Sequence, residues 1–295
     1  MKKDDVPTGL EKNRMSHEKI TPTAWDVAYD RAQAGIKYAQ EIFDEVKPTD
    51  ALEKKYLKYA TEARINIRFE ARYKLTNLLL AQNKSSQIFE IASGLSPRGQ
   101  IMAEEDPSLS YVELDLPDMA RNKRNILKNL FTKGVTKPQE NLQIEDGDAL
   151  DVQSLISATK HFKNAPVSIV TEGLLRYLDF NQQALVVKNV HSLLEKFGGV
   201  WICPDITLAR VTKNNLKKTE NQKLVEEISG IDVQKNEFAD EESAIKFFED
   251  AGFTVERHTF LEVIDELVCP LKMGLSRKET EESLNRPVFV MRLKK

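Results

Sequence analysis

The chain has 295 residues, of which 30% are charged and 41% hydrophobic, and its formal net charge at pH 7 is −3. This length allows one large domain, or two small ones, with a substantial hydrophobic core. The charge balance excludes a globally basic protein of the kind that binds nucleic acid or anionic membranes, so we expect neither partner.

The two cysteines, Cys203 and Cys269, lie far apart in the sequence and form no CxxC motif. This excludes a zinc site of that type or a disulfide framework and is typical of a reducing cytoplasm. The four histidines do not occur at metal-ligand spacing, so we expect no metal. No apolar run reaches the roughly 20 residues of a membrane span, and the segment MKKDDVPTGLEKNR lacks the apolar region of a secretory signal. We therefore expect a cytoplasmic protein.

The segment from about Thr23 to Asn83 has helical periodicity throughout. ITPTAWDVAYDRAQAGIKYAQEIF places apolar residues at near-helical intervals until Pro48, and ALEKKYLKYATEARINIRFEARYKLTNLLLAQ continues with strong helix formers. We predict an N-terminal helical cap over residues 1–83, packed on a second domain over residues 84–295.

From Gln87 onward, apolar runs alternate with helical stretches, which predicts a parallel sheet with right-handed crossovers. Two late strands, Phe253–Phe260 and Pro287–Leu293, have only a weak helical signal between them, which suggests an antiparallel pairing at the end of the sheet. The polar, lysine-rich segment at about 205–240 is predicted to be an insertion near the strand ends. The strands predicted before these two are IFEIA (88–92), YVELDL (111–116), 142–144, 167–170 and VWICPD (200–205). The helices predicted from Asp118 onward are 118–131, 151–160, 181–197 and 243–251.

The turn after the first predicted strand is rich in small residues: Ala92, Ser93, Gly94, Ser96 and Gly99. The second strand then ends in acid. Open α/β sheets bind nucleosides with a strand, a tight small-residue turn and a second strand that ends in a carboxylate about 20 residues later. The turn brings backbone close to the ligand, and the carboxylate accepts hydrogen bonds from the ribose.

Acidic or polar groups follow four successive predicted strands. Ligands of open parallel sheets bind outside these carboxyl ends, so we expect the groups to meet in one crevice. They are the segment Glu90 to Gly99, the pair Glu113 and Asp115, the pair Asp146 and Asp148, and Glu172.

Phosphate-binding motifs fit the turn poorly. GLSPRG is neither GxxxxGK[ST] nor GxGxxG, and the acidic stretch IMAEEDPSL that follows it would repel phosphate at a helix N-terminus. S-adenosylmethionine has no phosphate and carries a positive sulfonium, which an acid-lined site favours. A seven-stranded sheet with an antiparallel pair is also typical of methyltransferases that use it, so a nicotinamide-dependent oxidoreductase is the weaker interpretation.

Three blocks, QIFEIASGLSPRG, YVELDLPDMARNKRNIL and VTEGLLRYL, resemble the leucine carboxyl methyltransferase family, and the likeness extends from about Thr21 to Lys295. That family includes protein-phosphatase carboxyl methyltransferases, a tRNA wybutosine methyltransferase and bacterial O-methyltransferases of polyketide-type small molecules. PTAWDVAYDRA resembles the bacterial small-molecule branch. The resemblance implies a class I methyltransferase fold: a Rossmann-like seven-stranded sheet with an antiparallel last strand and a helical cap.

The resemblance also implies roles for individual residues. It implies that Arg72 contacts a carboxylate of the cofactor or the acceptor, with Arg68 or Arg64 as alternatives in register. The aromatic hydroxyl of Tyr177 is implied to lie near the acceptor, which makes Arg72 and Tyr177 the candidate catalytic residues. The residues expected to bind the cofactor are Arg72, Glu90, Gly94 of the turn, Asp115 at the ribose, Asp148 and Ala149 at the adenine, and Glu172 near the methionine end. Two positions depart from the family pattern, Ala92 in place of glycine and Ser96 in place of aspartate.

Other residues have plausible structural roles. Arg98 could pair with Glu104 or Glu105, and Arg176 could be a surface or lid residue. Glu113 could be a sheet-edge or capping carboxylate.

We therefore predict an S-adenosylmethionine-dependent O-methyltransferase that acts on a carboxylate or a hydroxyl of a small molecule. A carboxylate acceptor is already ionised and needs only an orienting arginine. A hydroxyl acceptor needs a base, and no histidine lies in the three blocks. The alternatives are a catalytically silent S-adenosylmethionine-binding module and a protein carboxyl methyltransferase.

Overall fold

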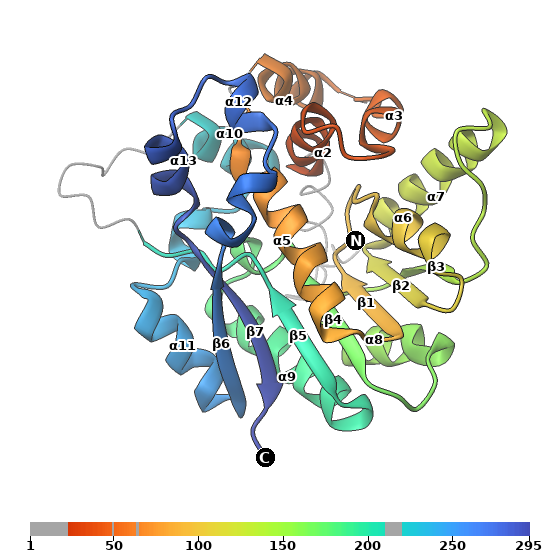
Figure 1. The fold of residues 1–295 in the computed structure, drawn as a ribbon, viewed down its shortest axis with the longest axis vertical. Coiled ribbons are helices and arrows are strands. Elements are labelled where there is room, and N and C mark those ends of the chain that lie inside the picture. Colours follow the sequence, from red (N-terminus) through yellow and green to blue (C-terminus); the bar gives the residue numbers. More distant parts are fainter. Residues whose placement is uncertain (1–22, 49, 63–64, 210–219) are drawn as a thin grey trace, which may run out of the picture.

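The computed structural model describes residues 23–48, 50–62, 65–209 and 220–295. Seven strands form one sheet in the order β3-β2-β1-β4-β5-β7-β6 (Figure 1). Strands β1 to β5 are parallel, and β7 runs antiparallel to both of its neighbours, β5 and β6, so the predicted seven-stranded sheet with an antiparallel last strand is confirmed. The strands are β1 (Gln87–Ile91), β2 (Ser110–Asp115), β3 (Leu142–Asp146), β4 (Val167–Thr171), β5 (Gly199–Cys203), β6 (Phe253–Thr259) and β7 (Pro287–Leu293).

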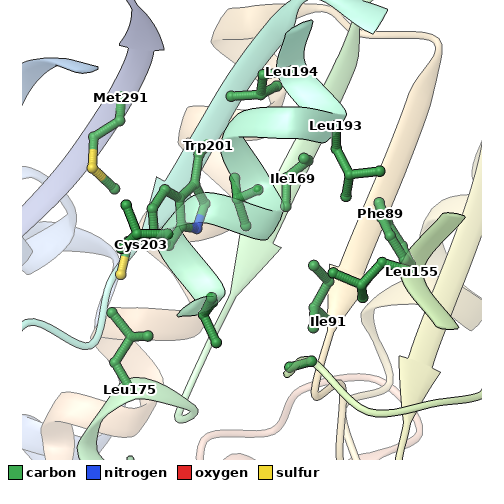
Figure 2. Close-up of a cluster of buried hydrophobic side chains, with 14 of the residues drawn as sticks. Phe89, Ile91, Leu155, Ile169, Leu175, Leu193, Leu194, Trp201, Cys203 and Met291 are labelled. Carbon is green, nitrogen blue, oxygen red and sulfur yellow. The ribbon is translucent and has the colours of Figure 1, made fainter. Parts of the chain in front are cut away.

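Both faces of the sheet are buried, because successive side chains of a strand point to opposite faces. Phe89 and Ile91 of β1 pack with Trp201 of β5 against α8 (Val152–Ala158) and α9 (Phe180–Phe197) (Figure 2). On the other face, Ile88, Val200 and Ile202 join the buried side of α5 (Ile67–Asn83). The core is therefore two-sided and fixes the strands in register.

The crossover helices predicted after the second, third and fourth strands are present as α7 (Pro117–Thr132), α8 and α9, and all three lie within two residues of their predicted bounds. The helix after the fourth strand, α9, is capped by Asp179, whose side chain accepts a hydrogen bond from the Gln182 amide in a capping box. The remaining helices after β1 are α6 (Arg98–Glu105), α10 (Glu220–Ser229), α11 (Glu241–Asp250), α12 (Cys269–Lys272) and α13 (Arg277–Leu284), with 3-10 turns η2 (Thr159–His161), η3 (Leu175–Tyr177), η4 (Val233–Asn236) and η5 (Phe260–Glu266).

The N-terminal helical region is interrupted more often than its periodicity indicates. It forms α2 (Ala24–Gln33), α3 (Ala39–Asp44), α4 (Ala51–Glu62) and α5. The first break contains Gly35 and Tyr38, both with a left-handed backbone, at φ +71° and +63°. Such a backbone cannot continue a right-handed helix, so the chain turns between α2 and α3.

The four helices do not form one separate layer. Helix α5 lies across the sheet, and its Ala71, Leu75 and Leu79 belong to the same buried cluster as β5 and β7. Helices α2, α3 and α4 gather beyond the carboxyl end of β5, with α10, α12 and α13 on the same side of the molecule (Figure 1). The carboxyl ends of the parallel strands are therefore covered by helices from both ends of the chain.

Of the segment predicted as an insertion, residues 210–219 lie outside the described part of the chain. The remainder contains α10, η4 and an isolated bridge between Leu208 and Phe238. Among the residues that the structure describes, no helix combines the length and the apolar character needed to cross a bilayer.

Candidate active site

The parallel register brings the ends of β1, β2, β3 and β4 side by side. In the register of the strands, Ile91 lies opposite Leu114 on one side and Thr171 on the other, and Asp115 lies opposite Asp146. A cavity of about 1120 Å³ opens where these strands end. Seven of the eight predicted site residues line it, namely Arg72, Gly94, Asp115, Asp148, Ala149, Glu172 and Tyr177.

Asp115 is held rigidly at the end of β2. Its Oδ2 accepts a hydrogen bond from the Gly94 amide at 2.7 Å, and its Oδ1 accepts one from the Leu116 amide at 2.8 Å. Burial raises the pKa of Asp115 to about 6, against the lowering effect of these two amides. The side chain is therefore largely ionised at neutral pH, and its remaining lone pairs can accept hydrogen bonds from two hydroxyls.

The turn after β1 contains an unusual alanine. Ala92 has φ +58°, and its amide donates to the Leu114 carbonyl at 2.8 Å. A left-handed backbone at a residue with a Cβ costs about 1–2 kcal/mol, so the bond to β2 holds Ala92 in a conformation that glycine adopts without strain. Its methyl group also lies in the wall of the cavity.

Replacing Ala92 with glycine is expected to raise the free energy of unfolding by about 0.5–1 kcal/mol, because relief of backbone strain exceeds the added freedom of the unfolded chain. The Ala92→Gly variant should bind S-adenosylhomocysteine at least as tightly as the parent does. Ala81→Gly on the exposed side of α5 is the matched control and should lose about 1 kcal/mol. Urea unfolding of both variants checks this, and a loss at position 92 similar to the loss at position 81 would contradict it.

Glu172, at the end of β4, is the centre of a buried ion cluster. Its Oε1 lies 2.5 Å from Arg31 Nη2 and 3.0 Å from Arg72 Nε, and its Oε2 lies 2.6 Å from Arg98 Nη2. Burial acts to raise the pKa of Glu172, but the three arginines hold it well below its usual range. Arg72 comes from α5, Arg31 from α2 and Arg98 from α6, the helix after the turn. Three helices therefore contribute to this cluster.

Glu90 does not line the cavity. It points to the α5 face of the sheet, where its carboxylate pairs with Arg98 Nη1 and accepts a hydrogen bond from the Tyr111 hydroxyl at 2.6 Å. The structure therefore places Glu90 behind the site, as a support for Arg98. Glu113 is also buried, and it pairs with Lys123 at 2.5 Å. It lies neither on an edge strand nor at a helix cap, because β2 is between β3 and β1.

The expected pairing of Arg98 with Glu104 or Glu105 is wrong. The turn leads directly into α6, which begins at Arg98, and residues six or seven positions apart are separated by roughly 9–10 Å along a helix. Arg98 instead points into the core, where it is fully buried. Glu104 accepts a hydrogen bond from the Tyr38 hydroxyl at 2.6 Å. The acids of IMAEEDPSL thus lie at the far end of α6, away from the turn.

The ion cluster carries a net positive charge, since three arginines face the two carboxylates of Glu90 and Glu172. Two buried atoms at the same wall, Arg31 Nε and Ser93 Oγ, have no hydrogen-bond partner among the described residues. A buried excess of positive charge and unpaired donors together favour an anionic, hydrogen-bonding ligand group. The carboxylate of a methionine moiety fits this end of the cavity.

The opposite end of the cavity has an apolar wall beside one carboxylate. Leu116, Met119 and Leu150 line it with Ala149, and Asp148 Oδ1 accepts a hydrogen bond from the Leu150 amide at 2.9 Å. An apolar wall with a hydrogen-bond acceptor beside it suits a purine with an exocyclic amine. The residues present therefore fit S-adenosylmethionine from its carboxylate to its adenine.

A third part of the cavity lies under the helical cap. Tyr177 lines it, with the Arg176 guanidinium 5.5 Å from the centre of the Tyr177 ring. Asp26 and Asp30 of α2 line the same part. Neither acid is among the site residues predicted from the sequence, although their spacing of four residues on a predicted helix places them on one face.

Of the alternatives to Arg72, Arg68 also lines the cavity, and its Nε donates to Asn66 Oδ1 at 3.2 Å. Arg64 lies outside the described residues. Of Arg72 and Arg68, both of which the structure describes, Arg72 pairs with Glu172. Across the same ranges, no three His, Cys, Asp or Glu side chains are grouped so that they could hold a metal ion.

Comparison with known proteins identifies the family. A model of the family described as leucine carboxyl methyltransferase matches residues 32–191, which is more than half of the chain. The chain belongs to the leucine carboxyl methyltransferase family. It is therefore a methyltransferase that uses S-adenosylmethionine. The matched region contains β1 to β4, the turn and, apart from Arg31, the cluster around Glu172. No curated protein matches the chain.

One of three solved structures that match the chain is similar enough to support the fold. A DUF574 family protein from Streptomyces avermitilis is 15% identical, with 87% of this chain and 90% of that chain covered and a TM-score of 0.51. The chain also matches PigF with SAH, at 13% identity, coverage of 94% and 69%, and a TM-score of 0.44. An O-methyltransferase family protein from Burkholderia thailandensis is 13% identical, with coverage of 93% and 72% and a TM-score of 0.42. At these identities the likeness concerns the fold alone, and only the first of the three reaches a TM-score of 0.5.

Proposed function

We propose that this member of the leucine carboxyl methyltransferase family transfers a methyl group to an oxygen of a small molecule. The observation that supports this most directly is that one cavity joins the ribose carboxylate Asp115, the Glu172 cluster and a further acid-lined space under the cap. At about 1120 Å³ the cavity exceeds the range of about 300–1,000 Å³ typical of single-ligand pockets. It therefore has room for the cofactor and a second small molecule.

Bound S-adenosylmethionine supplies a methyl group on a positively charged sulfonium. The residues of the chain have three tasks around it. Asp115 fixes the ribose, Asp148 and Ala149 receive the adenine, and Arg31 and Arg72 orient the carboxylate while Glu172 holds both arginines in place. Positioning and the exclusion of water are most of what such a transfer requires from the protein.

The acceptor is proposed to enter between the helical cap, α2 to α4, and the described part of the 205–240 segment. Residues from both line the cavity, including Tyr59 and Ala60 from the cap and Ile206 and Thr207 after β5. Tyr177 lies beside this space, and we propose that it contacts the acceptor. Helices placed over a site in this way can close on a substrate and set its specificity.

Calorimetry and turnover test this function together. S-adenosylmethionine and S-adenosylhomocysteine are expected to bind with micromolar affinity or better, and NAD is not expected to bind. Radiolabelled methyl should pass to members of a panel of phenols, alcohols and carboxylic acids. Cofactor binding without transfer to any small molecule, but with labelling of protein carboxyl groups, would support a protein carboxyl methyltransferase instead. Binding without transfer to either class would support a silent cofactor-binding module.

A further inference from the structure

Two carboxylates on one face of α2 form part of the cavity wall under the cap. Asp26 and Asp30 are one helical turn apart, and both line the cavity. Asp30 is only 6% exposed. Its Oδ2 accepts a hydrogen bond from the Asn66 amide at 2.9 Å, and its Oδ1 accepts none from the described residues. One oxygen thus anchors the side chain to the start of α5, and the other is left for a ligand.

No arginine or lysine among the described residues forms an ion pair with Asp30. Arg31, the next residue, is committed to Glu172, and its unpaired Nε marks the cofactor end of the same wall. Asp30 therefore lies on the same helix as Arg31, one residue from the proposed site of the cofactor's carboxylate, and it lines the cavity that also holds the proposed acceptor space.

The chemistry of Asp30 matches that of a proton acceptor. Burial raises its pKa to about 7, the Asn66 amide lowers it, and the nearby Asp26 raises it. Burial likewise raises the pKa of Asp26, to about 6. A base is most effective when its pKa lies near the working pH. On the side of α12, the Asp30 charge acts on the Cys269 thiol, whose pKa burial raises to about 12. Glu70 and Lys272 act on that thiol as well.

The same two acids disfavour a carboxylate acceptor. A third carboxylate placed between Asp26 and Asp30 would add like charge in a partly desolvated space. Three nearby arginines are already engaged: Arg72 pairs with Glu172, Arg176 is attracted to Asp26, and Arg68 donates to Asn66. A neutral hydroxyl meets no such repulsion and can donate its proton to a carboxylate.

We propose that Asp30 is the general base of this enzyme and that the acceptor is a hydroxyl compound, a phenol or an alcohol. This rests on the proposed O-methyltransferase function. The hydroxyl proton passes to Asp30 Oδ1, and an oxygen lone pair forms the new bond to the methyl carbon. The electron pair of the broken carbon–sulfur bond returns to sulfur. The products are a methyl ether and S-adenosylhomocysteine, and Asp30 later releases the proton to water.

The variant Asp30→Asn tests the base directly. Because a positioned base contributes about 10²–10⁴-fold, kcat with hydroxyl acceptors should fall at least 100-fold. The affinity for S-adenosylhomocysteine, measured by calorimetry, should stay within threefold of the parent. With S-adenosylmethionine at saturation, kcat/KM of the parent for the acceptor should rise about tenfold per pH unit below pH 7 and level off above it, and the variant should lack this limb. The control Asp250→Asn changes an exposed acid of α11 and should match the parent.

A binding experiment decides the acceptor class without turnover. On protein saturated with S-adenosylhomocysteine at pH 8, 2-naphthol should bind at least tenfold more tightly than 2-naphthoate. Asp30→Asn should narrow or reverse this preference. Tighter binding of 2-naphthoate to the parent, or methylation of carboxylic acids that Asp30→Asn leaves unchanged, would overturn the assignment of Asp30 while the methyltransferase function stands. Failure of S-adenosylhomocysteine to bind the parent would instead contradict the proposed function itself.

Discussion

Replacing Asp115 with alanine is expected to weaken the binding of S-adenosylhomocysteine at least 100-fold, which is about 2.7 kcal/mol. Hydrogen bonds to a charged group contribute about 1.5–3 kcal/mol each, and a ribose offers two hydroxyls to this carboxylate. Isothermal calorimetry at pH 8 measures the loss. Since protonation removes the charge, the affinity of the parent should also fall as the pH drops below the Asp115 pKa of about 6.

The fold should survive this substitution. Burial raises the pKa of Asp115, so the charged side chain is held at a cost in stability that alanine removes. This gain offsets the loss of the bonds from the amides of Gly94 and Leu116, which face the cavity and can bind water. The control Asp118→Ala removes an exposed acid near the start of α7 and should leave affinity unchanged. An affinity of Asp115→Ala within threefold of the parent, about 0.65 kcal/mol, would show that the ribose assignment is wrong.

The strand-end residues could be predicted from the sequence because topology alone brings them together. Asp115, Asp148 and Glu172 each follow an apolar run, and the carboxyl ends of neighbouring parallel strands necessarily share an edge of the sheet. Neither side-chain packing nor helix orientation was needed for this step. Glu90 was predicted to bind the cofactor because it lies near the end of β1. Its side chain points to the α5 face of the sheet, and proximity to a strand end does not show which face a side chain points to.

Residues that reach the site from helices could not be placed in this way. Arg98 enters the cluster only because α6 starts at the turn and directs its first residue toward β1 and β4. Arg31 and Asp30 depend on how α2 crosses the end of the sheet, which sequence periodicity does not specify. A signal was nevertheless present, because Asp26 and Asp30 repeat at helical spacing beside apolar positions that face the core.

The largest effect on stability is expected for Glu172→Gln. The substitution keeps the shape of the side chain but removes the charge that faces three buried arginines at 2.5–3.0 Å. Breaking a buried ion pair costs about 3–5 kcal/mol because the remaining charge stays buried without compensation. Urea unfolding at pH 7 should show a loss of this size, together with weaker binding of S-adenosylhomocysteine, since Arg31 and Arg72 lose the group that holds them.

The pH dependence separates this electrostatic cause from a simple packing defect. The arginines hold the pKa of Glu172 well below its ordinary value of 4.5, so its contribution is fully present above about pH 5. It is lost as the pH falls further, because the unfolded chain then binds a proton that the folded protein excludes. The difference between Glu172→Gln and the parent should therefore be constant from pH 8 to pH 6 and shrink below pH 4.5.

An exposed ion pair provides the matched comparison. Glu227 of α10 lies 2.7 Å from Lys55 of α4, and both side chains are at least half exposed. Glu227→Gln should change the free energy of unfolding by less than about 1 kcal/mol, because water screens such a pair. If both substitutions cost the same, or if the Glu172→Gln difference stays unchanged in acid, then the charge of Glu172 does not organise the arginines, and the proposed carboxylate site at this end of the cavity loses its basis.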